Sequence, residues 1–392
     1  MSGLTARKAI WCGIFLSFLT LGVGFSASAA RADDQSQPGV ARISIVQGNV
    51  DVKRGDSGDT VAAAVNAPVM VGDYISTDGA ARAEVQFDDA NFLRIGYGTQ
   101  LRLTKLDQND NSLQLAQGTV ELRVFAMDGA NPSIETPSVT VTPSEPGQYV
   151  VSVTSDGNTQ VTVRSGSASV ADDQGTQTVM PGNTMIATGD PSNASFQDVS
   201  VIADVSFDGW TDQLDAQVAQ ADAPGYVNSG VVGANDLNDY GQWVDVPTYG
   251  EVWQPTEDSG WAPYTDGRWV WEPYYGYTWV SYEPWGWAPY HYGNWFYASD
   301  YGWCWYPGSV YERPVWRPAM VAFFGYGSGD FDISVGFGYG DIGWVPVAPF
   351  EPFYPWWGGN SVTVVNVTNI YNITNVYSNF GRGGYVVVHA RD

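Results

Sequence analysis

Two stretches of this sequence are nearly the same: residues Trp261–Trp269 read WAPYTDGRW, and residues Trp287–Trp295 read WAPYHYGNW. A second motif, Tyr-Gly-x-x-Trp, begins at Tyr249, Tyr275 and Tyr301, so both motifs recur every 26 residues. A fixed period of this length indicates a supersecondary unit that is repeated along the chain. The unit is predicted to be a β-hairpin or β-meander whose aromatic side chains pack across neighbouring strands.

The dipeptide Asp266-Gly267 lies between two aromatic segments of this repeat, which is a strong signal for a tight hairpin turn. Gly293 occupies the same place in the next copy. The sequence therefore predicts that Gly267 and Gly293 hold equivalent turn positions with positive φ. Fifteen of the 17 tryptophans fall within residues 241–357, which we therefore predict to be a separate domain.

Residues 40–190 have a different character, with short runs in which apolar and polar residues alternate between Gly, Asp, Asn and Pro. Such alternation is typical of half-buried β-strands. Glycines precede several runs, at Gly48, Gly118, Gly166 and Gly182, and predict tight corners between strands. The expected fold is mainly β: an elongated sandwich or solenoid-like domain here, followed by the aromatic-rich β-hairpin repeat domain.

Several stretches of the first domain follow one another in a characteristic order: Ala41–Ser44, Gly48–Val50, Gly72–Thr77, Arg82–Val85, Leu93–Ile95, Ile134–Pro137 and Gly147–Val153. This order resembles the FecR domain, the periplasmic module of the ferric citrate regulator family. In signalling members of that family, a membrane helix links the domain to a cytoplasmic anti-sigma domain. Only residues 1–8 precede the apolar run of this chain, so the resemblance implies a periplasmic binding or scaffolding module. Polar residues within the motifs, such as Asp73, Arg82 and Glu84, are expected on a solvated strand face.

The aromatic domain carries a resemblance of its own. Residues 241–357 resemble a tryptophan-rich bacterial domain of unknown function that contains WAPYxxGxW repeats and follows FecR-like domains in some secreted proteins. That resemblance implies an architecture and no particular activity.

The first residues of the chain predict export. Arg7 and Lys8 precede an apolar run that ends at Phe25 and is followed by small residues, which is the order of a signal peptide. Residues 1–32 are therefore predicted to be removed, so that the mature chain begins at Asp33, is periplasmic or extracellular, and has no membrane span. Retention of the run as a membrane anchor is the alternative.

Composition outside the two domains, and charge overall, add three expectations. Residues 191–240 are acidic and polar and are predicted to be a linker with a short helix near Thr211–Ala221. Residues 358–392 are rich in Asn, Val and Ile and are predicted to be an extended tail. The formal net charge is -25, from 17 Lys+Arg and 42 Asp+Glu, and it excludes nucleic acid as a partner because an acidic surface repels phosphates.

Catalytic and metal-binding residue types are scarce. His291 and His389 are the two histidines, and Cys304 is the one cysteine after the export signal, so nucleophilic dyads and zinc sites lack residues. No cofactor is expected. A glycan-active enzyme that uses the carboxyl pair Glu272 and Glu283 is a remote alternative.

The main functional hypothesis is a non-catalytic envelope protein that binds or scaffolds a cell-envelope polysaccharide or protein. Aromatic faces suit sugar rings, so the predicted contacts are the indoles that recur in register, Trp261, Trp269, Trp287 and Trp295. The competing interpretation is that these rings fill the core of a thin sheet. A FecR-type sensor or scaffold in a cell-surface signalling chain is the alternative function.

Overall fold

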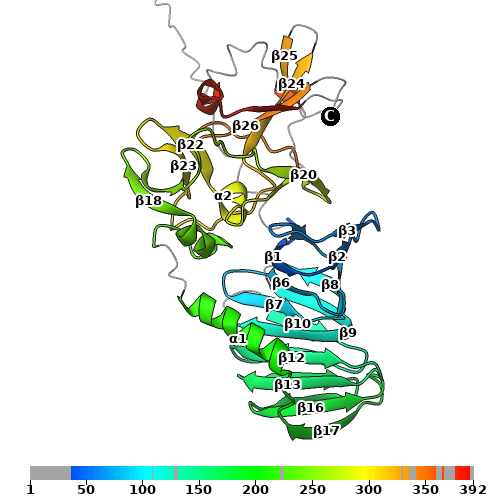
Figure 1. Ribbon diagram of the computed structural model, residues 1–392. Helices are drawn as coiled ribbons and strands as arrows, with labels where there is room; N and C mark the ends of the chain where they lie inside the picture. Colours follow the sequence, from blue (N-terminus) through cyan, green and yellow to red (C-terminus); the bar gives the residue numbers. More distant parts are fainter. Residues whose placement is uncertain are drawn as a thin grey trace, which may run out of the picture. The chain divides into compact units, whose positions relative to one another are not determined.

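The structure is a computed structural model that describes residues 37–107, 109–127, 131–220, 225–327, 330–334, 341–358, 364–365 and 376–388 (Figure 1). The predicted export signal lies outside the described residues, and so do residues 366–375 of the predicted tail. Within the described part of the chain, no helix combines the length and the apolar character that a bilayer crossing requires.

The described residues of the first domain form a series of strands: β1 (Ala41–Gln47), β2 (Val50–Lys53), β3 (Thr60–Ala62), β4 (Pro68–Val69), β5 (Tyr74–Thr77), β6 (Arg82–Gln86), β7 (Asn91–Ile95), β8 (Gln100–Leu106), β9 (Asp110–Val124), β10 (Asn131–Glu135), β11 (Thr140–Pro143), β12 (Gly147–Val153), β13 (Thr159–Ser165), β14 (Ala168–Asp172), β15 (Gly175–Val179), β16 (Asn183–Thr188) and β17 (Ser195–Ser200). One layer has the order β4-β1-β6-β7-β9-β12-β13-β16-β17. The other has the order β3-β2-β5-β8-β9-β10-β11-β14-β15. The long strand β9 belongs to both layers, because its first part pairs with β8 and β10 and its second part pairs with β7 and β12.

Alternating side chains hold the two layers together. In β8, Leu101 and Leu103 are buried while Gln100 and Arg102 are exposed, as the period of two in the sequence predicts. The buried side chains of both layers form one continuous aliphatic core. The predicted mainly β fold with a sandwich-like first domain is confirmed.

The predicted linker is in part a component of this first domain. Strand β17 lies within it and pairs with β16, and α1 (Val205–Gln220) follows. The helix begins where the Oδ1 atom of Asp204 accepts hydrogen bonds from the backbone N–H groups of the next turn. Phe207, Trp210 and Leu214 then pack against the layer that contains β12 (Figure 1). The helix begins earlier than Thr211 because this apolar stripe, rather than composition, sets its length.

The aromatic domain begins with η1 (Ala234–Asp239) and contains three hairpins with a short helix between the second and the third: β18 (Gly241–Val246) with β19 (Gly250–Pro255), β20 (Gly267–Glu272) with β21 (Gly276–Ser281), α2 (Trp287–His291), and β22 (Asn294–Ala298) with β23 (Gly302–Tyr306). The second strands begin at Gly250, Gly276 and Gly302, at the 26-residue period of the sequence. Trp253 pairs with Trp305 and joins the first and third hairpins into one sheet. The predicted β-hairpin repeat domain is therefore confirmed.

The last described part of the chain forms a five-stranded sheet. Its order is β27-β25-β24-β26-β28, with these bounds: β24 (Val321–Gly327), β25 (Asp330–Ser334), β26 (Asp341–Pro346), β27 (Val364–Val365) and β28 (Val386–Val388). The short helix η2 (Ser378–Arg382) precedes β28. Within the predicted extended tail, β28 is thus a paired strand next to β26.

The hairpin turns lie elsewhere than the sequence predicts. Gly267 is the first residue of β20, and the hairpin it begins turns between Glu272 and Gly276. Gly293 has the predicted positive φ of 60°, whereas Gly267 does not have a positive φ, so the prediction of equivalent positions is wrong. At Gly267 a Cβ atom would lie 2.5 Å from the Trp279 ring, so this residue is needed for close packing and not for a turn.

Candidate functional site

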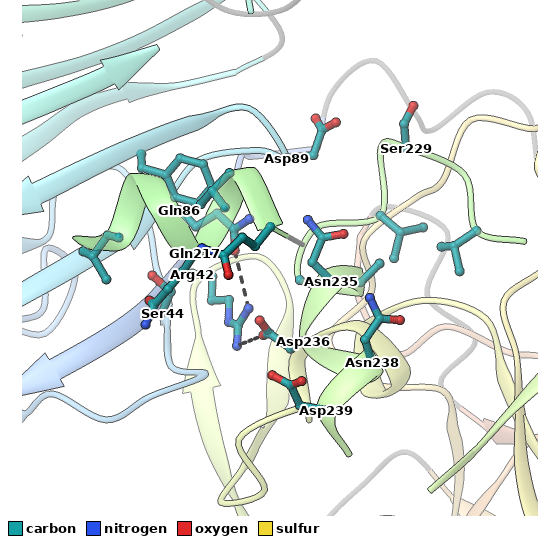
Figure 2. Close-up of a pocket in the computed structure, with 18 of the residues that line it drawn as sticks. Arg42, Ser44, Gln86, Asp89, Gln217, Ser229, Asn235, Asp236, Asn238 and Asp239 are labelled. Atoms are coloured by element: carbon teal, nitrogen blue, oxygen red, sulfur yellow. Dashed lines mark hydrogen bonds and ion pairs between the residues drawn. The ribbon is translucent and has the colours of Figure 1, made fainter. Parts of the chain in front are cut away.

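A groove of about 1180 Å³ is formed by residues of both domains (Figure 2). Strands β1 and β6 contribute Arg42, Ser44 and Gln86, and the last turns of α1 contribute Gln217. The opposite side is formed by residues 225–239 and by Trp243 of β18. The groove is assembled from segments that are distant in sequence, and both domains contribute to it.

Arg42 organises the floor of the groove. Its guanidinium donates to Asn66 Oδ1 at 3.1 Å and to Gln86 Oε1 at 3.4 Å, and forms an ion pair with Asp236 at 2.7 Å. Figure 2 shows Arg42 between Gln86 and Asp236. Because the side chain is only 3 % exposed, its charge interacts with neighbouring groups of the protein and not with solvent.

Gln86 also lines the groove. The side chain is 8 % exposed, and its carboxamide oxygen accepts the hydrogen bond from Arg42.

The sides of the groove are acidic and rich in amides. Carboxylates come from Glu84, Asp89, Asp236 and Asp239, against the single guanidinium of Arg42. Amide and hydroxyl groups are contributed by Gln217, Gln220, Asn228, Ser229, Asn235 and Asn238. Tyr226 and Trp243 add two aromatic rings whose centroids are 5.5 Å apart. The groove can therefore hydrogen-bond an occupant extensively.

A buried network of ion pairs lies beneath the side of the groove that α1 forms. Arg94 of β7 is fully buried and contacts Glu84 at 3.1 Å, Glu121 at 2.8 Å and Asp215 of α1 at 2.7 Å. Burial raises the pKa of Glu121, and the neighbouring Arg94 opposes that shift. The network fixes α1 on the sheet and so fixes the side of the groove that α1 forms.

Two of the charged motif positions are buried instead of solvated. Glu84 belongs to the Arg94 network, and Asp73 accepts hydrogen bonds from the backbone N–H groups of Gly55 and Met70. Asp73 also forms an ion pair with Arg54 at 3.0 Å. The expectation of a solvated strand face is wrong here because ion pairs with Arg94 and Arg54 hold the two carboxylates inside the fold.

The two domains meet through hydrogen-bonded side chains. Arg54 forms an ion pair with Glu272, and the Asn66 amide donates to the backbone oxygen of Glu283 at 2.8 Å. The Tyr275 hydroxyl donates to the backbone oxygen of Pro38 at 2.6 Å. These contacts lie next to the groove, since Arg42 and Asn66 hydrogen-bond each other.

Glu272 and Glu283, the carboxyl pair of the enzyme alternative, are both bound by other side chains of the protein. The Glu272 carboxylate is buried against Arg54. The Glu283 carboxyl accepts hydrogen bonds from Trp261 Nε1 at 2.9 Å, from Tyr290 Oη at 2.9 Å and from Ser281. Burial raises the pKa of Glu283, and the three donors oppose that shift. Neither carboxyl lines the groove, and the arrangement gives no support to glycan hydrolysis.

The four predicted sugar-binding indoles are all part of one aromatic core. Trp287 and Trp295 are 1 % and 0 % exposed, and Trp261 and Trp269 are partly buried against the same cluster. Trp261 contacts Trp295 with ring centroids 5.4 Å apart, while Trp269 contacts the Trp279 ring at 5.2 Å. The two buried indoles have no face to offer a ligand in this structure. Their proposed binding role stays a prediction.

Sequence reasoning did not find the groove. The Asp236-Leu237-Asn238-Asp239 cluster is visible in the sequence, but it reads as a turn. Arg42 and Gln86 lie on strands, where polar residues are ordinarily solvated. The only available signal was the excess of amides and carboxylates in the predicted linker.

The fold defines the class: a chain of two β-domains that share a groove lined mostly by polar side chains. Comparisons with known families identify both domains. Residues 73–169 match the FecR protein family, and residues 234–351 match a family of unknown function, DUF6600. The chain therefore contains a FecR domain followed by a DUF6600 domain.

No curated protein matches the chain. Two solved structures that match it are both described as "Crystal structure of a putative anti-sigma factor from Parabacteroides distasonis ATCC 8503". One is 17 % identical and covers 42 % of this chain and 72 % of its own, and the other is 15 % identical and covers 43 % and 76 %. Both have a TM-score of 0.29, which is too low to relate the folds in detail.

Proposed function

We propose that this protein is a non-catalytic sensor or scaffold of the cell envelope, which holds a partner protein in the groove between its FecR and DUF6600 domains. Support comes from the FecR domain, since that family is one of regulators. The observation that carries the proposal is that both domains line one groove. An occupant would contact both domains at once, so its binding could be transmitted through the hydrogen-bonded junction.

A site-specific photo-crosslinking experiment tests this function. A photoreactive amino acid replaces Asn235, which lines the groove, and in a control chain it replaces Gln197 on the exposed strand β17. Irradiation of intact cells is expected to attach one defined envelope protein at position 235 and none at position 197. The same products at both positions, or none at either, would contradict the proposal.

Export is part of the proposal. The predicted mature start is Asp33, with the chain in the periplasm or outside the cell, and N-terminal sequencing of the protein from those fractions checks it. An intact chain beginning at Met1 in the membrane fraction would instead indicate an anchor. An anchored chain would favour the signalling alternative.

A second candidate function is binding of a neutral envelope polysaccharide. It is favoured by one exposed indole, Trp271, which is 63 % exposed and packs edge-on against Tyr277 with centroids 5.2 Å apart. An exposed ring of this kind suits stacking on a sugar. Co-sedimentation with purified cell-wall material, lost in Trp271→Ala, would support it, and equal sedimentation of the two proteins would remove it.

A further inference from the structure

We propose that the DUF6600 domain binds one acidic sugar unit of an envelope glycan in a small pocket at Arg382, with the sugar ring against tyrosine rings and its carboxylate on the guanidinium. The pocket has a volume of about 250 Å³ and shares no lining residue with the groove between the domains. The inference goes beyond the proposed function, because it concerns a small ligand at a different site.

Two equivalent turns of the repeat form one side of the pocket. Tyr249 and Tyr301 each begin a Tyr-Gly-x-x-Trp motif, at the turns of the first and third hairpins, and both line the pocket. The two turns come together because Trp253 of β19 pairs with Trp305 of β23. Tyr275, which begins the second copy of the motif, is buried in a different cluster. The pairing of the first and third hairpins thus places two tyrosines of the motif at one pocket.

Aromatic rings are exposed at this pocket. Tyr297 and Tyr301 line it and are 40 % and 37 % exposed. Phe350 is 79 % exposed and stacks on Tyr249, another lining residue, with ring centroids 6.1 Å apart. Its φ of 68° is unusual for a bulky residue, and such backbone outliers cluster at functional sites. Flat aromatic faces with hydroxyl groups at their ends suit a sugar ring.

Arg382 of η2 supplies an unused positive charge. Its guanidinium lies over the Tyr297 ring, 5.9 Å from the centroid, and forms no ion pair or hydrogen bond within the described part of the chain. Asp300 also lines the pocket, but the two side chains form no ion pair with each other. The forked donors of the guanidinium are therefore available to a carboxylate of a ligand, and Asp300 can accept hydrogen bonds from sugar hydroxyls.

The pocket is held in shape before a ligand binds. The Asn379 amide of η2 donates to the backbone oxygen of Trp295 at 2.8 Å, which fixes η2 on β22. The backbone N–H of Ser378 donates to the Glu351 carboxylate at 2.8 Å. These contacts hold Arg382 beside the turns of the repeat, so little ordering of the protein would be needed on binding.

The size and the charges narrow the ligand class. A volume of about 250 Å³ lies below the 300–1,000 Å³ that is usual for drug-sized ligands, so it admits one sugar unit. A phosphate dianion would be repelled by Asp300 more strongly than a single carboxylate. A carboxylate without a ring would gain nothing from the tyrosines, and a neutral sugar would leave Arg382 without a partner.

The test measures binding of three probes to the full chain by NMR titration. The first is a trimer of galacturonic acid, and the second is its fully methyl-esterified form, which has the same rings without the charge. The third is tri-alanine, which has a carboxylate and no sugar ring. The acid trimer is expected to bind about tenfold more tightly than the ester, because only the acid can form charge-assisted hydrogen bonds with Arg382. Tri-alanine is expected not to bind measurably.

Matched variants locate the binding. Arg382→Gln is expected to weaken binding of the acid trimer about tenfold, to the level of the ester. Arg268→Gln removes an exposed arginine of β20 that does not line the pocket, and it is expected to change binding less than about twofold. Tyr301→Ala is expected to weaken the acid and the ester alike, whereas Tyr311→Ala, at a 95 % exposed residue outside the pocket, is expected to leave both unchanged. Thermal unfolding confirms that each variant is folded.

Four results would overturn the proposal. Equal binding of the acid and the ester would remove the role of Arg382, and so would equal losses in the two arginine variants. Tri-alanine that binds as tightly as the acid trimer, and is lost in Arg382→Gln, would replace the sugar by a peptide carboxylate. Absence of binding by all three probes would remove the site. None of these measurements involves the groove, so the proposed function is tested separately by crosslinking at position 235.

Discussion

Replacing Gly267 with alanine tests whether this glycine is needed for close packing against Trp279 and not for a hairpin turn. In β20 this residue lies against Trp279, and an added Cβ would be 2.5 Å from the ring atom Cζ2 and 2.6 Å from the Val280 carbonyl oxygen. Carbon atoms in contact normally lie about 3.5–4.0 Å apart, so the ring or the strand would have to move by about 1 Å. Trp279 is buried in the aromatic core and has little room to yield.

The magnitude follows from this overlap. Overpacking of a well-filled core typically costs about 1–3 kcal/mol, and a clash with a buried indole and a backbone oxygen belongs at the upper end, at about 3 kcal/mol. Gly302 is the matched control, since it has a φ of 77° and an added Cβ would meet nothing within 4 Å. Alanine there carries only backbone strain, about 1 kcal/mol.

Urea unfolding followed by tryptophan fluorescence measures both variants. Fifteen of the 17 tryptophans lie in residues 241–357, so the signal reports on the DUF6600 domain. We expect Gly267→Ala to lose about 2 kcal/mol more than Gly302→Ala by linear extrapolation. An equal loss, or a larger one in Gly302→Ala, would refute the close-packing explanation and restore the turn as the critical feature.

Two further variants test buried polar groups. Arg94→Met leaves Glu84 and Glu121 without their cation and should lower the free energy of unfolding by about 3–5 kcal/mol. Adding Glu121→Gln to this variant should recover part of the lost stability. A loss below about 1 kcal/mol in Arg94→Met would contradict the proposed importance of the network. Burial lowers the pKa of His291 to about 3, and its Nδ1–H donates to the Arg317 carbonyl at 2.7 Å. The unfolded chain protonates this histidine below its ordinary pKa of 6.5 and the folded chain does not, so stability is complete above pH 6.5 and falls by about 1.4 kcal/mol per pH unit towards pH 3. His291→Gln should remove that slope from the pH dependence measured by urea unfolding, and parallel curves for the two proteins would argue against it.

Local patterns in the sequence were enough for the type of each element. The alternation in runs such as Gln100–Leu103 requires only that successive side chains of a strand point to opposite faces, and the structure follows it. The 26-residue period likewise marked three hairpins, because each copy has to bury the same aromatics. The predicted position of the turn was wrong, because Asp266-Gly267 is a turn signal only when nothing packs on the glycine.

Tertiary packing decided which polar residues are solvated and which rings are exposed. Glu84 alternates with apolar neighbours as a solvated position would, yet it is buried and paired with Arg94. The recurring indoles are identical in the sequence whether they face a core or a ligand, and contacts such as Trp261 with Trp295 place them in the core.

By itself, the sequence determined that this is a two-part β-protein with an acidic surface and few groups for catalysis, because alternation, period and charge are properties of the chain alone. Only the tertiary structure decided where a ligand could bind. Arg42, Gln86, Gln217 and Asp239 are far apart along the chain, and the groove exists only once α1 is fixed by Arg94 and the two domains are joined through Arg54 and Asn66.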